Sequence, residues 1–95
     1  MDLEFSGEVW FWRGPAPHHF VTVPDDECQD LALAAPVVSY GWGVLPVTVQ
    51  IEDTEWTTSL FPRNGGYIVP LKAAARAAEH IEIGDTVTVH LHVDM

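Results

Sequence analysis

The sequence predicts an all-β fold with minor α content, namely a small closed or partly open antiparallel β-barrel with two short helices. Six or seven short segments alternate apolar and polar residues with the period of two that is typical of half-buried strands. No strand-helix-strand unit of about 30 residues is repeated, which argues against a parallel sheet. Closure into a barrel removes the exposed edges that so many short strands would otherwise present.

The first strand is expected over residues 3–12, where apolar and polar residues alternate. Its predicted core face consists of Leu3, Phe5, Gly7, Val9 and Phe11. Residues 13–17 contain one glycine and two prolines, which end the strand and let the chain change direction. Residues 20–23 then predict a second short strand, which stops at Pro24 because the next amide donor is missing.

A helix is expected over residues 25–35. The three carboxylates of residues 25–27 suit a helix N-terminus, because free amides and the helix dipole favour negative charge there. Pro36 is expected to end this helix, whose apolar stripe is Cys28, Leu31, Ala32 and Ala35. Residues 37–43 interleave aromatic residues with glycines, which indicates a strand or a tight loop.

A hairpin is expected from two β-rich runs, residues 44–51 and 54–61, because only residues 52–53 separate them. The residues of this hairpin expected to face one way are Val47, Val49 and Ile51. Residues 62–66 are rich in proline, asparagine and glycine and predict a second turn. A brief strand at residues 67–69 follows that turn.

The last part of the chain predicts a second helix and a final strand. Five of the nine residues 71–79 are alanine, a good helix former, and Lys72 and Arg76 are spaced four apart on one helix face. Gly84-Asp85 forms a turn, after which residues 86–93 alternate again. The side chains expected to point inward from this strand are Val87, Val89, Leu91 and Val93.

Length and composition predict one β-barrel domain over residues 1–95, because a chain of this size buries enough surface for a single core. No apolar run approaches the about 20 residues that cross a membrane, and residues 1–4 lack the start of a signal peptide. The lone Cys28 excludes an internal disulfide and fits a reducing compartment. A soluble, cytoplasmic protein with no membrane partner is therefore expected.

The excess of acidic residues limits the kinds of partner that the chain can bind. Four basic residues oppose fourteen acidic ones, for a net charge of -10. Such a chain repels a phosphate backbone or an anionic membrane on average, so nucleic acid is an unlikely partner. The residues available for a basic stripe are Arg13, Arg63, Lys72 and Arg76.

Four segments carry a family resemblance: FSGEVW at residues 5–10, YGWGVLPV at 40–47, SLFP at 59–62 and GYIVPLK at 66–72. With these motifs the chain resembles a family of small bacterial and archaeal β-barrels known as a domain of unknown function. The resemblance implies a relationship to the double-split barrels of antitoxin and transition-state-regulator type, in which a short helix and Gly-Asp similarly precede the final strand. No catalytic or binding residues accompany the resemblance, so it leaves the function open.

Five histidines raise the question of a metal site. His90 and His92 share one face of the last predicted strand, and His18-His19 could add a third ligand. Structural zinc, however, usually needs four ligands that include thiolates, and Cys28 has no partner in a C-x-x-C motif. We therefore expect neither a metal nor another cofactor.

Catalytic motifs are also missing. Ser6, Ser39 and Ser59 have no G-x-S-x-G context, and most carboxylates fall in turns or at a helix N-terminus, where solvation and capping explain them. The sequence thus favours a protein that is not an enzyme, with a metal-dependent hydrolase built on the histidines as an alternative.

The tryptophans give the strongest indication of a site, since four are many for so short a chain. Alternation places Trp10 and Trp12 on the face of the first strand opposite the core. They either complete a second small core, covered for instance by the helix at residues 25–35, or line a groove that stacks on a planar ligand. For the groove, the candidate ligand-binding residues are Trp10, Trp12, Tyr40, Trp42, Arg63 and Tyr67.

The sequence therefore favours a small-ligand-binding or protein-interaction module that works by shape recognition. The partner is a small molecule or a protein, and the sequence does not distinguish them. A third hypothesis is a structural unit that forms a homo-oligomer, because related barrels pair chains by exchanging strands.

Overall fold

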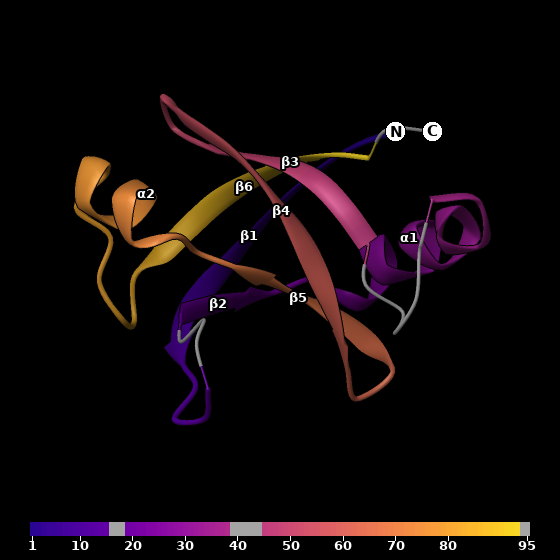
Figure 1. The fold of residues 1–95 in the computed structure, drawn as a ribbon, viewed down its shortest axis with the longest axis horizontal. Coiled ribbons are helices and arrows are strands. Elements are labelled where there is room, and N and C mark those ends of the chain that lie inside the picture. Colours follow the sequence, from indigo (N-terminus) through magenta and orange to yellow (C-terminus); the bar gives the residue numbers. More distant parts are fainter. Residues whose placement is uncertain (16–18, 39–44, 94–95) are drawn as a thin grey trace.

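The computed structural model describes residues 1–15, 19–38 and 45–93, which form a closed six-stranded antiparallel barrel with two helices (Figure 1). The elements are β1 (Asp2–Phe11), β2 (His19–Thr22), α1 (Asp25–Val38), β3 (Leu45–Ile51), β4 (Thr54–Arg63), β5 (Gly66–Pro70), α2 (Ala73–Ala78) and β6 (Thr86–His92). The order around the barrel is β1-β2-β5-β4-β3-β6. The predicted fold class is confirmed.

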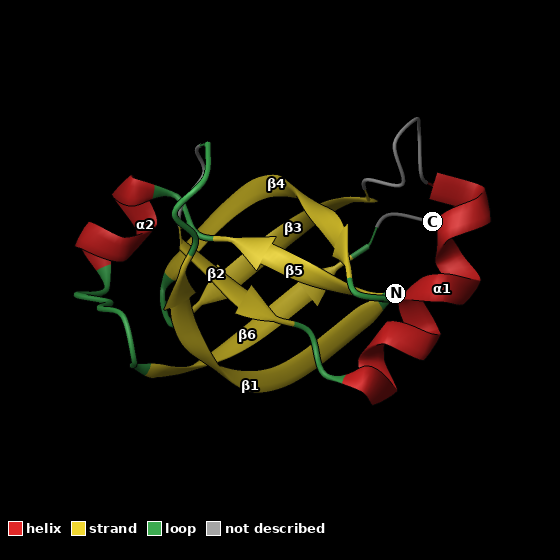
Figure 2. Cartoon of the chain, turned by 90° about the horizontal axis from the view of Figure 1, so that it is seen from below, coloured by secondary structure: helices red, strands yellow, loops and turns green. Residues whose placement is uncertain are grey.

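Two long strands close the barrel because each pairs with different neighbours along different parts of its length (Figure 2). In β1, residues 2–8 pair with β6 and residues 9–11 pair with β2. In β4, residues 54–60 pair with β3 and residues 61–63 pair with β5. Because each of these two strands passes from one partner to another, the sheet closes into a barrel. One face of each strand then points into the barrel and the other points outward.

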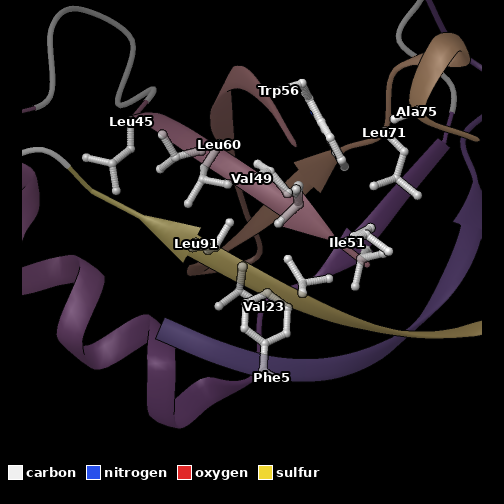
Figure 3. Close-up of a cluster of buried hydrophobic side chains, with 14 of the residues drawn as sticks. Phe5, Val23, Leu45, Val49, Ile51, Trp56, Leu60, Leu71, Ala75 and Leu91 are labelled. Atoms are coloured by element: carbon white, nitrogen blue, oxygen red, sulfur yellow. The ribbon is translucent and has the colours of Figure 1, made fainter. Parts of the chain in front are cut away.

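One face of each long strand supplies the hydrophobic core (Figure 3). Phe5 and Val9 point inward from β1, and their side chains are 7% and 1% exposed. Val49 of β3, Leu60 of β4 and Leu91 of β6 meet them in the same cluster. The period-two alternation seen in the sequence is therefore the alternation between the barrel interior and its outer surface.

The helices lie at opposite ends of the barrel (Figures 1 and 2). α1 packs against β3 and β5 and contributes the fully buried Leu31 to the core. α2 packs against β4 and contributes Ala75, and Leu71 and Ile81 are buried on either side of it in the sequence. Each helix thus covers one open end of the barrel with small or branched apolar side chains.

Two glycines are required by their positions. Gly7 brings β1 against β2, because a Cβ on Gly7 would lie only 2.7 Å from Cγ1 of the buried Val21. Asn64 and Gly65 join β4 to β5 with φ angles of 51° and 81°, the left-handed conformation that a tight two-residue hairpin turn demands. A Cβ on Gly65 would meet nothing, so its backbone conformation, and not lack of space, favours glycine there.

The prediction that Phe11 faces the core is wrong, since its side chain is 43% exposed. Phe11 is the last residue of β1, where the strand has left β6 and pairs with β2. Its ring packs edge-on against His19, with the ring centroids 5.4 Å apart. The apolar-polar alternation of the sequence therefore continues past Val9 to Phe11, where the strand no longer borders the barrel interior.

The prediction that the first helix ends at Pro36 is also wrong, because α1 continues to Val38. A proline late in a helix removes one amide donor but leaves the following residues able to adopt helical dihedral angles. Of the segment predicted as a strand or loop, residues 37–38 are helical and residues 39–43 lie outside the described residues. In the described part of the chain, neither helix is long and apolar enough to span a membrane.

Candidate functional site

The outer surface of the barrel carries a second apolar cluster, separate from the core. It is formed by Trp10 of β1, Phe20 of β2, Ile68 of β5 and Phe61 of β4, and we call it the outer cluster. Trp10 lies directly opposite Phe20, and Phe61 lies directly opposite Ile68, in the strand register. Because directly opposed residues share a face of the sheet, these four side chains form one stripe across four adjacent strands.

The outer cluster is well packed. The rings of Trp10 and Phe20 are 5.2 Å apart between centroids, and those of Phe20 and Phe61 are 6.3 Å apart in an edge-on arrangement. Phe20 is 4% exposed and Ile68 is 7% exposed, although neither belongs to the barrel core. Nε1 of Trp10 also donates a hydrogen bond of 3.0 Å to Oγ1 of Thr22, which fixes the orientation of the indole.

Arg63 lies over two of the tryptophans. It follows Phe61 by two residues on β4 and therefore projects from the same outer face. Its Cζ atom is 4.7 Å from the ring centroid of Trp10 and 5.1 Å from that of Trp12, within the range of cation-π attraction. The guanidinium is thus held at one place on the surface by two indole rings.

A groove of about 320 Å³ opens beside this arginine. We call it the aromatic groove, and it is lined by Trp12, Phe20, Phe61, Pro62, Arg63 and Ile68, together with Pro15 from the connection after β1. Trp12 is 40% exposed and lies so close to the backbone of Gly14 that a Cβ there would come within 2.1 Å of the indole Nε1. Of the described residues that line the groove, all are apolar or aromatic except Arg63, which is charged.

The structure brings together three of the six residues expected at the binding site: Trp10, Trp12 and Arg63. Tyr67 is half-buried and packs against the barrel core, because it shares the inward face of β5 with Val69. It lines a neighbouring hollow of about 230 Å³, which Arg63 also borders. Tyr40 and Trp42 lie outside the described residues.

Five residues of the groove were not predicted from the sequence: the two prolines Pro15 and Pro62, and Phe20, Phe61 and Ile68. Their runs are apolar at successive positions, so alternation alone does not say which side chain points outward. The turn at Asn64-Gly65 could have identified two of them. A two-residue turn fixes the register of the strands on either side, and this register sets Phe61 opposite Ile68. The fourth tryptophan, Trp56, is 8% exposed and belongs to the barrel core (Figure 3).

The histidines do not converge. His19 lies on β2, where its Nε2 is 3.4 Å from Nη1 of Arg76, whereas His90 and His92 lie on β6. β1 separates these two strands in the barrel, so His19 cannot serve as the third ligand. Among the described residues no group of three or more histidine, cysteine, aspartate or glutamate side chains could hold a metal ion, and His18 lies outside them.

The two histidines of β6 instead face carboxylates across the strand pair. Nδ1 of His92 is 2.8 Å from Oδ1 of Asp2, and Nδ1 of His90 is 3.6 Å from Oε2 of Glu4. The hydrogen bond from His92 holds the pKa of the Asp2 carboxyl below its ordinary value of 3.8. This outer wall is polar and solvated, in contrast to the wall that carries the aromatic groove.

Comparison with protein families matches residues 5–91 to the family described as "Domain of unknown function (DUF1905)". The matched range reaches from β1 into β6 and includes every strand of the barrel. The family resemblance expected from the sequence motifs is confirmed. Comparison with curated proteins finds none that matches this chain.

Proposed function

The chain belongs to the DUF1905 family, whose description assigns no activity, and from this premise we propose that its barrel binds a small molecule with a planar ring in the aromatic groove. The observation that supports the proposal is the Arg63 guanidinium, which two indole rings hold at the edge of an apolar groove. In this arrangement the protein recognises its ligand by shape, ring stacking and one charge.

The lining suits an aromatic ring. Trp12 and Phe61 are only partly buried, so a flat ring can stack on them or pack edge-on, and such pairs add to the gain from burying apolar surface. A volume of about 320 Å³ is at the lower end of the roughly 300–1,000 Å³ of small-molecule sites. The ligand is therefore compact, of the size of one ring or two fused rings.

The site is also organised before a ligand arrives. The indole of Trp10 is fixed by its hydrogen bond to Thr22 and by its contact with Phe20. Trp10 in turn supports the guanidinium of Arg63. Binding then requires little further loss of side-chain freedom, which otherwise weakens association.

The proposal is tested by titrating ¹⁵N-labelled protein with a panel of small ring compounds and following the indole and arginine side-chain signals by NMR. A binder is expected to shift the signals of Trp10, Trp12 and Arg63 together, and to leave the indole of the core residue Trp56 nearly unchanged.

Variants make the test specific to the groove. Trp12→Ala removes lining from the groove and should abolish the shifts, whereas Ile83→Ala is a matched control because Ile83 is 56% exposed and is not among the groove residues. If no ring compound shifts the groove signals at millimolar concentration, or if Trp12→Ala leaves binding intact, the proposal is wrong.

A further inference from the structure

We infer that the ligand of the aromatic groove is a planar-ring monocarboxylate, whose carboxylate is bound by Arg63 while the ring packs in the groove. The inference rests on the proposed function, because it concerns the same site. It adds the chemical class of the ligand, which ring stacking alone does not define. Three features of Arg63 support it: its lack of an acidic partner within the described part of the chain, its contacts with two indole rings and the charges around it.

Among the described residues, Arg63 has no acidic partner, although the composition offers carboxylates in excess. The chain has fourteen carboxylates and four lysine and arginine residues, so a surface arginine has many acidic side chains to pair with. Within the described residues, the ion pairs join His90 to Glu4 and His92 to Asp2, and none involves Arg63. The guanidinium of Arg63 instead lies against two indole rings, so its positive charge can pair with an anionic ligand.

The contacts of Arg63 also leave its hydrogen-bonding edge for a ligand. A guanidinium donates hydrogen bonds in its own plane, whereas aromatic rings interact with its face. Among the described residues, Arg63 lies 4.7 Å and 5.1 Å from the ring centroids of Trp10 and Trp12 and takes part in no ion pair, so its in-plane donors remain for a ligand. Two parallel N–H groups of such an edge match the two oxygens of a carboxylate, and the resulting charge-assisted pair is both strong and directional.

The position of Arg63 in the groove determines which chemical groups a ligand must combine. Arg63 lines the groove together with Phe61 and Trp12, so one ligand can reach the guanidinium and the aromatic lining at the same time. The other lining residues in the described ranges are apolar or aromatic. The complementary ligand therefore has an apolar ring and one charged group, joined by a short connection that fits in about 320 Å³.

The surroundings favour a single negative charge over a double one. Asp25 borders the neighbouring hollow together with Arg63, and the first turn of α1 also contains Asp26 and Glu27. The chain as a whole has a net charge of -10. A phosphate dianion meets more repulsion from this acidic turn than a carboxylate does, and among the described lining residues Arg63 is the one cation that offsets it.

The experiment compares three ring compounds: indole-3-acetate and its neutral amide indole-3-acetamide, which share the indole ring and differ in the attached group, and phenyl phosphate, which carries a phosphate on a single benzene ring. Their affinities for the full chain are measured by NMR titration at neutral pH and low ionic strength. Indole-3-acetate should bind about tenfold or more tightly than the amide, because a hydrogen bond to a charged partner is stronger than a neutral one. The advantage should shrink as salt is added.

Variants then test whether Arg63 causes the preference for the carboxylate over the amide. Arg63→Gln should bring the affinity for indole-3-acetate down to that for the amide, while Arg63→Lys should retain part of the preference. Arg13→Gln is the matched control, because it removes the same charge from an exposed arginine that is not among the groove residues and should keep the preference. The backbone spectrum of each variant checks that the barrel is still folded.

The outcomes separate the two proposals. If the amide binds as tightly as the carboxylate to the unchanged protein, the carboxylate inference is overturned and the ring-binding function stands. If phenyl phosphate binds most tightly, the assigned ligand class is wrong. If none of the three probes nor any other ring compound binds, the proposed function fails together with the inference.

Discussion

Replacing Phe20 by alanine tests whether the outer cluster contributes to stability like a second core. Phe20 is 4% exposed and lies between Trp10 and Phe61, at centroid distances of 5.2 Å and 6.3 Å. Phenylalanine-to-alanine changes in cores cost about 3–5 kcal/mol. Here the lower end, about 3 kcal/mol, is expected because the open groove beside Phe20 lets neighbouring side chains move into the space.

The assay is urea denaturation of the unchanged protein and of Phe20→Ala, with Phe11→Ala as the matched control. Phe11 is 43% exposed, so its replacement should cost less than about 1 kcal/mol. If the two variants lose the same stability, or if Phe20→Ala loses less than about 1 kcal/mol, the outer cluster is a surface feature and does not act as a packed unit.

Three further changes probe the barrel itself. Gly7→Ala should lower the free energy of unfolding by about 1–3 kcal/mol, because its Cβ would overlap Cγ1 of Val21; unchanged thermal unfolding would contradict this. Gly65→Ala should cost about 1 kcal/mol through its φ of 81° alone, and a stability equal to that of the unchanged protein in urea would show that the turn can adopt another conformation. Asp2 has a lowered pKa in the folded state, so its hydrogen bond to His92 stabilises the fold above pH 3.8 and this contribution is lost as the pH falls below that value. At about pH 5 the melting temperature of Asp2→Asn should therefore differ from that of the unchanged protein, and the difference should shrink in more acidic solution; a difference that persists to about pH 2 would exclude this role.

The sequence was sufficient for the strands because half-buried strands have a period of two. Val47, Val49 and Ile51 were expected on one face, and all three are buried in the barrel. The turn at Asn64-Gly65 was equally clear, because few residues adopt its left-handed angles. Local chemistry determines these features, so a single sequence reveals them.

The candidate site was only partly predictable because it depends on register and on closure. Alternation placed Trp10 on the outer face, but only the pairing of strands far apart in the sequence sets Arg63 above it. The same limit explains Tyr67, which was expected to join the groove and instead faces inward. Phe11 shows the converse error, since a periodic pattern does not reveal where the enclosed interior ends.

The pairing of β1 with β6 also determines when this barrel can form. The first and last strands of the described chain lie side by side, and the hydrogen bond between the Met1 amine and the carbonyl of Val93 joins residues 92 positions apart. Forming such distant contacts carries a large loop-closure entropy, which slows folding. During synthesis, residues 2–8 of β1 lack their partner strand until β6 has left the ribosome. The outward-facing charges of β1, Asp2, Glu4 and Glu8, are then the main protection against pairing with another nascent chain.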